Sequence, residues 1–272
     1  MTEPALGARR VRSLLDAYGV RPSKSRGQNF VIDPNTIRML VANAAIGPDD
    51  TVLEIGPGAG SLTVALAASA RRVVAVEVDP RLVKLLRASL AAPNVEVIDA
   101  DALEVDLGSL GANRLVSNLP YAVAAPLVIH ALQQAPEIGQ LDVMTQREVG
   151  ERLAARPGSR LYGRTSVVVS LYAEARVVAN VSRRAFYPVP GVDSVVVRVR
   201  RRVGDLDVDP ERFERVAHAA FAQRRKIMRN ALAPLAGSVG AAERALNAAG
   251  IEPGVRAEAV DREGYIALAR VL

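Results

Sequence analysis

Residues 51–67 read TVLEIGPGAGSLTVALA, and this stretch decides the fold class. Its first five residues form a short apolar run that predicts a buried strand. Gly56, Gly58 and Gly60 follow within five positions, and helical composition begins directly after them. Glycines let a backbone approach a ligand closely, and the first turn of a helix offers unpaired N–H groups beside it. The stretch therefore predicts either a nucleotide-binding strand, turn and helix or a purely structural turn of the same shape.

The middle of the chain repeats this alternation of strand and helix. Short apolar runs lie at 72–76, 95–98, 115–117 and 141–145, and helical segments lie at 80–90, 124–134 and 146–155. Strands separated by helices of this length predict βαβ units and a parallel sheet. Residues 165–172 fit either a strand or a helix. Two further β-like runs, 177–181 and 195–199, flank a proline-rich turn and predict an antiparallel pair that closes the sheet.

A smaller unit is expected after the sheet. Residues 204–209 are polar and rich in aspartate, as is typical of a linker, and Asp209-Pro210 then predicts a helix start. Apolar residues recur at helical spacing after it, and short helical stretches continue to Leu272. The sequence thus predicts an α/β domain over 1–203, with a basic arm at 1–30, and a small all-α domain over 204–272.

Composition excludes several kinds of site. The chain has no cysteine and two histidines, which excludes a disulfide scaffold and a thiolate nucleophile and makes a metal centre unexpected. The longest uncharged run, 115–136, contains three prolines and is interpreted as strand, loop and buried helix, not as a membrane span. Arginines interrupt the N-terminus, so no secretory signal is predicted. We expect a cytoplasmic protein without metal or membrane partners.

Charge is distributed unevenly along the chain. Residues 1–30 have six basic and two acidic side chains, residues 31–182 have 13 and 16, and residues 183–272 have 16 and 11. Basic ends that converge in space would form a surface for a polyanion such as RNA. Scattered and solvated arginines are the alternative, and the bias of 32 arginines over three lysines can also reflect a GC-rich genome.

Polar side chains follow the second, third and fourth predicted strands. Glu77 stands 21 residues after Gly56, a spacing that suits a carboxylate on a ribose diol. Asp101 can accept a hydrogen bond from the adenine amino group of such a ligand, or it can cap a loop. The fourth strand ends in Asn118-Leu119-Pro120-Tyr121. The Asn118 oxygen and the Leu119 carbonyl can accept both N–H bonds of a base amine, while Tyr121 stacks on the base. A turn with a core tyrosine is the alternative.

Several motifs together resemble one family. The E-x-G-x-G-x-G turn is similar to that of class I, Rossmann-like methyltransferases, which bind S-adenosylmethionine, and N-L-P-Y resembles the motif of adenine-N6 methyltransferases. Further matches, in the family's order, are KSRGQNF at 24–30, QREV at 146–149, YGR at 162–164, FYPVP at 186–190, VDS at 192–194 and RRK at 224–226. The combination identifies the chain as a member of the KsgA/RsmA family of small-subunit (16S) rRNA adenine-N6 dimethyltransferases.

The resemblance assigns roles to individual residues. It implies that S-adenosylmethionine is held by Gln28, Asn29, Val31, Gly56, Gly58, Glu77, Asp101 and Asn118. It implies that Asn118, Leu119, Tyr121 and Phe186 hold the target adenine. Arg26, Arg147, Arg224, Arg225 and Lys226 are the candidate RNA contacts. The chain departs from the family at Gly191, where a lysine is common, and at Val31, where leucine is usual.

The resemblance also implies an activity. The family dimethylates two adjacent adenosines near the 3′ end of 16S rRNA during ribosome biogenesis, so a monomer acting on the 30S subunit is expected. Two alternatives remain open from the sequence. One is an Erm-type methyltransferase of 23S rRNA, and the other is a ribosome-assembly or nucleic-acid-binding factor with little catalysis.

Overall fold

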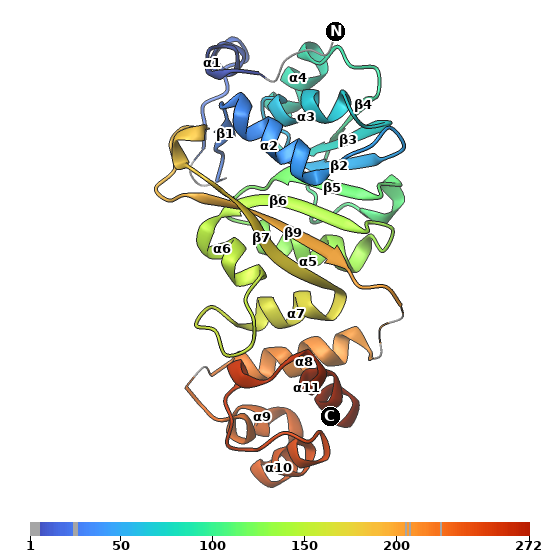
Figure 1. The fold of residues 1–272 in the computed structure, drawn as a ribbon, viewed down its shortest axis with the longest axis vertical. Helices are drawn as coiled ribbons and strands as arrows, with labels where there is room; N and C mark the ends of the chain where they lie inside the picture. The colour runs from blue at the N-terminus through green and yellow to red at the C-terminus, as the bar shows by residue number, and fades with distance from the viewer. Residues whose placement is uncertain (1–5, 24–26, 205, 207, 224) are drawn as a thin grey trace. The chain divides into compact units, whose positions relative to one another are not determined.

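The predicted strands form one mixed seven-stranded sheet in the computed structural model, which describes residues 6–23, 27–204, 206, 208–223 and 225–272 (Figure 1). Its order is β4-β3-β2-β5-β6-β9-β7, in which β2 to β6 pair in parallel and β9 runs antiparallel to β6. The predicted fold class is therefore confirmed. Because the chain crosses over between parallel neighbours, the carboxyl ends of β2, β3 and β5 meet at one edge of the sheet.

The element bounds follow the sequence patterns closely. The strands are β1 (Phe30–Val31), β2 (Thr51–Ile55), β3 (Arg72–Glu77), β4 (Val95–Asp99), β5 (Arg114–Asn118), β6 (Gln140–Gln146), β7 (Ala173–Val181), β8 (Phe186–Tyr187) and β9 (Ser194–Arg201). The helices are α1 (Ala8–Ala17), α2 (Pro34–Ala44), α3 (Ser61–Ala67), α4 (Pro80–Ser89), α5 (Ala124–Gln134), α6 (Arg147–Leu153), α7 (Arg164–Tyr172), α8 (Pro210–Phe221), α9 (Met228–Ala236), α10 (Val239–Ala248) and α11 (Arg262–Val271). The segment that fitted either class, 165–172, is helical.

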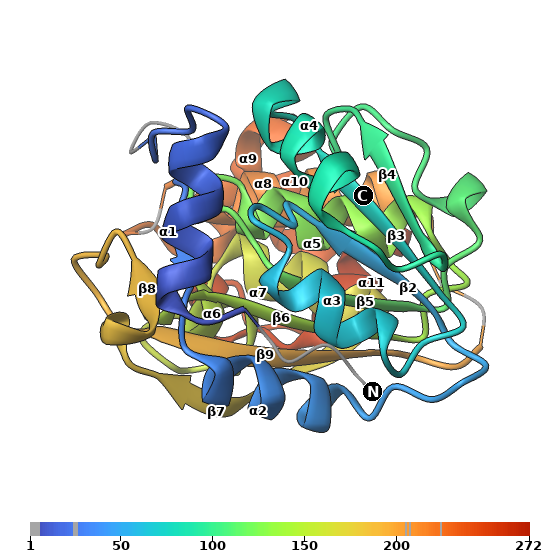
Figure 2. The same cartoon turned by 90° about the horizontal axis from the view of Figure 1, so that it is seen from above.

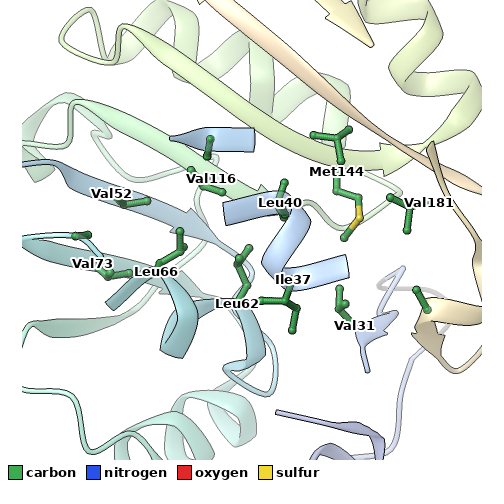
Figure 3. Packing of buried hydrophobic residues seen from close by; sticks show 14 of the residues in the cluster. Val31, Ile37, Leu40, Val52, Leu62, Leu66, Val73, Val116, Met144 and Val181 are labelled. Carbon is green, nitrogen blue, oxygen red and sulfur yellow. The ribbon is translucent and has the colours of Figure 1, made fainter. Parts of the chain in front are cut away.

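The central strands of the sheet are buried on both faces. On one face, Ile37 and Leu40 of α2 and Leu62 and Leu66 of α3 pack against alternate strand residues such as Val116 (Figure 3). The next residues along the same strands are buried as well, among them Leu53, Val74, Leu115, Val143 and Val197. Burial on both faces explains why these strands read as continuous apolar runs in the sequence.

Aspartate–proline pairs start three helices. Asp79 and Asp209 cap α4 and α8 as predicted, since each side chain accepts the backbone N–H two residues later at 3.1 and 3.0 Å. Asp33 caps α2 in the same way, with bonds to the N–H groups of Asn35 and Thr36. Proline at the first helical position costs no hydrogen bond, because that N–H has no partner within the helix.

Two short strands and an N-terminal helix were not predicted. Strand β1 pairs antiparallel with β8, where Val31 lies opposite Phe186. Helix α1 lies beside β8 (Figure 2), and its Arg12 guanidinium stands 4.7 Å from the ring centre of Tyr187. The apolar side of α1 packs on Phe30. Residues 8–17 of the basic N-terminal segment therefore form a folded helix in the first unit.

The chain forms two compact units, one of residues 1–150 and 176–201 and the other of residues 151–175 and 202–272. The second unit is helical and has an aromatic centre, in which the Tyr265 ring lies 6.2 Å from the rings of both Phe213 and Phe221. Helix α7 belongs to this unit, whereas the sequence placed 165–172 with the first domain. The predicted boundary between two domains at residue 204 stays a prediction.

A buried ion pair joins two strands of the sheet. Asp142 on β6 is buried, and its Oδ1 accepts a hydrogen bond from Arg198 Nε on β9 at 2.8 Å. Gln140 donates to the other carboxylate oxygen, and Arg198 Nη2 donates to the carbonyl of Asn43 at the end of α2. The pair therefore ties the antiparallel strand to both the parallel sheet and a covering helix.

Replacing Asp142 with alanine should destabilise the chain by about 3–5 kcal/mol, because it leaves a buried arginine without its counter-charge. Urea unfolding followed by circular dichroism measures the change. Glu96→Ala, which removes the exposed partner of Arg72, is the matched control and should cost at most about 1 kcal/mol. Equal losses in the two variants would contradict a central role for the buried pair.

Candidate active site

The carboxyl ends of β2, β3 and β5 line a pocket with about 710 Å³ of empty space, including open solvent. Residues 27–31, here called the strap, line it together with the glycine turn, the end of β3 and the turn after β5. Of the predicted site residues, the pocket brings together Gln28, Asn29, Val31, Gly56, Gly58, Glu77, Asn118, Leu119 and Tyr121. Four segments distant in sequence thus converge where an α/β sheet is expected to bind its ligand.

The glycine turn approaches its neighbours too closely for side chains. Gly56 and Gly58 have φ values of 69° and 60°. A Cβ on Gly58 would lie 2.9 Å from the ring of Phe30 in the strap, and one on Gly56 would lie 3.3 Å from Pro120. The glycines therefore let the turn after β2 pack directly against both the strap and the turn after β5, with its backbone facing the pocket.

Glu77 braces this turn from the end of β3. Its Oε2 accepts the Gly58 N–H at 3.1 Å, and its Oε1 accepts the N–H groups of Val78 and Asp79 at 3.0 Å each. Burial raises the pKa of the carboxyl group. Each carboxylate oxygen can accept two hydrogen bonds, so Oε2 retains capacity for a ligand hydroxyl. The residue predicted to hold a ribose also shapes the glycine turn.

Two further pocket residues received no role from the sequence. Glu54 at the end of β2 is 1% exposed, and burial together with the neighbouring Glu77 raises its pKa to about 8. Glu54 Oε2 and Ser61 Oγ are buried and have no hydrogen-bond partner within the described part of the chain. Unpartnered buried acceptors are unfavourable unless a ligand satisfies them. Glu54 is the first residue of the E-x-G-x-G-x-G motif, and this position was the sequence signal that could have assigned it to the pocket.

Asn118 presents one free acceptor to the pocket. Its Nδ2 donates to the carbonyl of Asn29 at 3.0 Å. Its Oδ1 is buried and finds no partner among the described residues. The buried Oδ1 is therefore an atom of this amide that lacks a partner, and a group that donates an N–H or O–H would satisfy it. The next residue is held as well, because the Leu119 N–H donates to the Met144 carbonyl at 3.0 Å.

An aromatic pair stands beside Asn118. The Tyr121 ring lines the pocket and lies edge-on to Phe186, with 6.4 Å between ring centres. Partial burial raises the pKa of the Tyr121 hydroxyl. Phe186 is fully buried beneath it and does not line the pocket. Tyr121 therefore offers a ring to a planar ligand, and a direct contact from Phe186 to a base stays a prediction.

The strap is fastened at both ends of the pocket. Gln28 Oε1 accepts the Ser23 N–H at 3.0 Å, and its Nε2 lies 3.4 Å from Asp79 Oδ2. At the other end Val31 pairs with Phe186. The predicted grouping of Gln28, Asn29 and Val31 near the glycine turn therefore has a geometric basis in these bonds.

The remaining predicted residues lie elsewhere. Asp101 is exposed, is not among the pocket-lining residues, and accepts the Leu103 N–H at 2.9 Å as a turn aspartate does. Arg147 begins α6 and donates to Asn180 Oδ1 at 3.0 Å. Arg225 and Lys226 are exposed between α8 and α9 of the second unit. Arg26 and Arg224 lie outside the described residues.

Two absences can be stated for the described residues. None of their acidic and histidine side chains gather into a group of three that could hold a metal ion. None of the helices in the described ranges is both long and apolar enough to cross a membrane.

The pocket combines two kinds of binding surface. Glu54 and Glu77 offer carboxyl groups beside a turn whose backbone is open to close approach, which suits a ligand with hydroxyl groups. Asn118, Leu119 and Tyr121 offer acceptors and a ring, which suits a planar base with an exocyclic amine. The residues therefore fit S-adenosylmethionine on one side and an adenine on the other.

Sequence comparisons place the chain among known proteins. Residues 20–272 match the family described as ribosomal RNA adenine dimethylase. The ribosomal RNA small subunit methyltransferase A of Streptomyces avermitilis is 46% identical, over 99% of this chain and 96% of that protein. The enzyme of the same name from Thermobifida fusca is 48% identical, over 91% of this chain and 89% of that protein.

Solved structures show the same fold. A dimethyladenosine transferase from Plasmodium falciparum superposes with a TM-score of 0.76 at 23% identity, covering 88% of this chain and 95% of its own. The 23S rRNA methyltransferase ErmE superposes with a TM-score of 0.67 at 32% identity, covering 90% of this chain and 99% of its own.

The buried Glu54 predicts a specific pH dependence. Between the ordinary pKa of 4.5 and the value of about 8 the folded chain binds more protons than the unfolded chain, so the free energy of unfolding should fall as the pH rises through this range. Each pKa unit corresponds to about 1.4 kcal/mol, which limits the loss to several kcal/mol.

Urea unfolding of the ligand-free protein at several pH values within that range measures this loss. Glu54→Gln keeps the shape of the side chain but does not titrate, so it should flatten the dependence. An unchanged pH dependence in that variant would show that Glu54 is already ionised when buried.

Proposed function

Because this chain belongs to the ribosomal RNA adenine dimethylase family, we propose that it dimethylates N6 of two adjacent adenosines near the 3′ end of 16S rRNA. It is an S-adenosylmethionine-dependent rRNA adenine dimethyltransferase, with a role in rRNA processing. The observation that carries the proposal is the Asn118 amide, whose buried Oδ1 has no partner among the described residues while its Nδ2 binds the strap. An exocyclic amine is the group on adenine that satisfies it.

Similarity favours the small-subunit substrate over the large-subunit one. The relatives named for the small subunit are 46% and 48% identical to this chain, and the 23S enzyme ErmE is 32% identical. Neither the fold nor the N-L-P-Y motif distinguishes the two substrates. The choice between them therefore rests on this difference in sequence identity and on the test with 30S and 50S particles below.

The cofactor would be held by the acidic side of the pocket and by the strap. Glu77 is positioned for the ribose, the backbone of Gly56 and Gly58 for close approach, and Gln28, Asn29 and Val31 for the methionine end. When bound, S-adenosylmethionine supplies a methyl group activated by the positive charge of its sulfonium. Asp101 is proposed for the cofactor's adenine, although its Oδ1 already accepts the Leu103 N–H.

The chain's own residues would prepare the target base. Asn118 Oδ1 and the Leu119 carbonyl accept the two N–H bonds of N6, which keeps the nitrogen lone pair localised and available. Tyr121 stacks on the ring and fixes its plane, a contact worth about 1–3 kcal/mol per base. Holding the reactants in place supplies most of the rate, since orientation alone can remove about 7–11 kcal/mol of a barrier.

Dimethylation places a further demand on these acceptors. After the first transfer the methylated N6 loses one proton to water and retains one N–H, so only one of the two acceptors keeps a partner in the second transfer. The pocket must therefore release the monomethyl base or reposition it between the first and second methyl transfers. Four transfers complete the proposed pair of dimethyladenosines.

RNA contact outside the pocket is assigned to basic residues at the ends of the chain. We assign Arg26, Arg147, Arg224, Arg225 and Lys226 to phosphate binding, and we place the activity in the cytoplasm, on 30S particles, with a monomeric enzyme. Sedimentation of the purified chain tests whether the enzyme is a monomer. The dependence of RNA binding on salt concentration tests phosphate binding by the second unit, and its slope should decrease in Arg225→Glu.

Asn118→Ala should reduce methyl transfer by about 100-fold or more, the range seen when one preorganised hydrogen-bonding group is removed from an active site. Cofactor affinity, measured by calorimetry, should fall by much less than transfer, because the variant also loses the bond from Asn118 Nδ2 to the strap. Asn247→Ala, an exposed position on α10, is the control and should leave both values unchanged. Parallel loss of transfer and cofactor binding would contradict the assigned role.

Glu77→Ala should instead weaken cofactor binding by about 10–100-fold, because hydrogen bonds to charged groups contribute about 1.5–3 kcal/mol each. Calorimetric titration with S-adenosylmethionine measures the effect, and thermal unfolding shows whether the turn still forms. Glu96→Ala, an exposed carboxylate on the adjacent strand, is the control. Unchanged affinity in a folded Glu77→Ala chain would refute the ribose contact.

The function itself is tested with labelled S-adenosylmethionine and three substrates: unmethylated 30S particles, 50S particles and naked rRNA. We expect label in 30S particles, mapped to two adjacent adenosines near the 3′ end of 16S rRNA. Label confined to 50S particles would establish the 23S substrate instead. Absence of label in all three would indicate a binding factor without this catalysis.

A further inference from the structure

The Val192-Asp193-Ser194 motif has no role in the function described so far. Ser194 is the first residue of β9 and is fully buried. Its Oγ lies 2.7 Å from the hydroxyl oxygen of Tyr121, a residue 73 positions earlier in the chain. The tyrosine that faces the pocket is thus tied by its far end to the antiparallel strand of the sheet.

Ser194 is itself held in place by its surroundings. In the β6–β9 pairing it lies opposite Gln146, the last residue of β6. The preceding residue, Asp193, accepts the Arg147 N–H through its carbonyl and the Arg183 N–H through its Oδ1, at 3.0 Å each. The serine hydroxyl therefore belongs to a part of the sheet edge that is fixed on both sides.

The other sides of Tyr121 are restrained by packing. Its ring meets the edge of Phe186, which is fully buried. Its backbone lies against Gly27 of the strap, where an added Cβ would stand 3.1 Å from the Tyr121 nitrogen. These contacts limit where the ring lies, but they are non-directional. Among the described residues, the bond to Ser194 is the directional contact of the hydroxyl, so it fixes the direction of the ring's long axis.

We propose that Ser194 is a positioning residue, whose hydroxyl holds the long axis of the Tyr121 ring in the direction required for methyl transfer. The inference rests on the proposed role of Tyr121 as the platform for the target adenine. A base stacked on a ring that has swung aside would carry its N6 away from the reactive line, and misplacement by about 1 Å can cost 100-fold in rate. The serine acts only through the tyrosine, so it should affect the rate of transfer and not the binding of either substrate.

The experiment compares Ser194→Ala, Tyr121→Phe and the double variant. Each single change removes the same hydrogen bond without adding volume. We expect each to lower kcat on unmethylated 30S particles by about tenfold, within the range of a lost buried hydrogen bond. The KM for 30S particles and the cofactor Kd should stay within about twofold. The double variant should be no slower than either single one, because both remove one shared interaction.

Controls separate this inference from general damage and from the function on which it rests. Ser170→Ala removes a serine hydroxyl bonded only within α7 and should leave kcat unchanged. Thermal unfolding identifies any variant that has lost its fold, and Tyr121→Phe then tests the same bond from the other side. Tyr121→Ala should abolish transfer. If it does not, the platform role of Tyr121 fails.

Two results would overturn the role of Ser194 while leaving the platform intact. One is a folded Ser194→Ala chain with unchanged kcat although Tyr121→Ala is inactive. The other is a double variant whose loss is the product of the two single losses, which would mean that the hydroxyl groups act independently.

Discussion

The hydrogen bond from Asn118 Nδ2 to the Asn29 carbonyl is the constraint on which the rest of the pocket depends. It is 3.0 Å long and joins segments 89 residues apart. It holds the strap against the turn after β5, and it orients the amide so that the buried Oδ1 remains without a partner among the described residues. A buried amide oxygen without a partner favours a ligand group that donates, and an exocyclic amine meets that requirement.

The sheet and its glycines make this bond possible. Because β2, β3 and β5 are parallel neighbours, their carboxyl ends deliver the glycine turn, Glu77 and Asn118 to one edge. Gly58 then allows Phe30 of the strap to pack on the turn, at a distance where any side chain would clash. Separate strands thus supply the acidic side of the pocket and its amide side. The same strap contacts both sides and holds them next to each other. We propose that one framework thereby places both cofactor and base.

Local patterns in the sequence were sufficient for much of this. The strand at 51–55, the helix at 124–134 and the aspartate caps at 79 and 209 were predicted because each depends on neighbouring residues. Strands β1 and β8 were not, since two residues carry no periodicity and form only by pairing with each other. Glu54 and Ser194 received no role because their significance lies in distant partners. Phe186 was predicted to pack against the target base. Its complete burial next to Tyr121 could not be predicted, because burial depends on the whole fold.

The most direct test of the central claim is a crystal structure of the enzyme with S-adenosylhomocysteine and an adenosine bound. The pocket geometry predicts that N6 lies within hydrogen-bond distance of Asn118 Oδ1 and of the Leu119 carbonyl, with Asn118 Nδ2 still on the Asn29 carbonyl. An adenosine bound through other atoms, or an Asn118 amide that has turned its nitrogen toward the base, would contradict it.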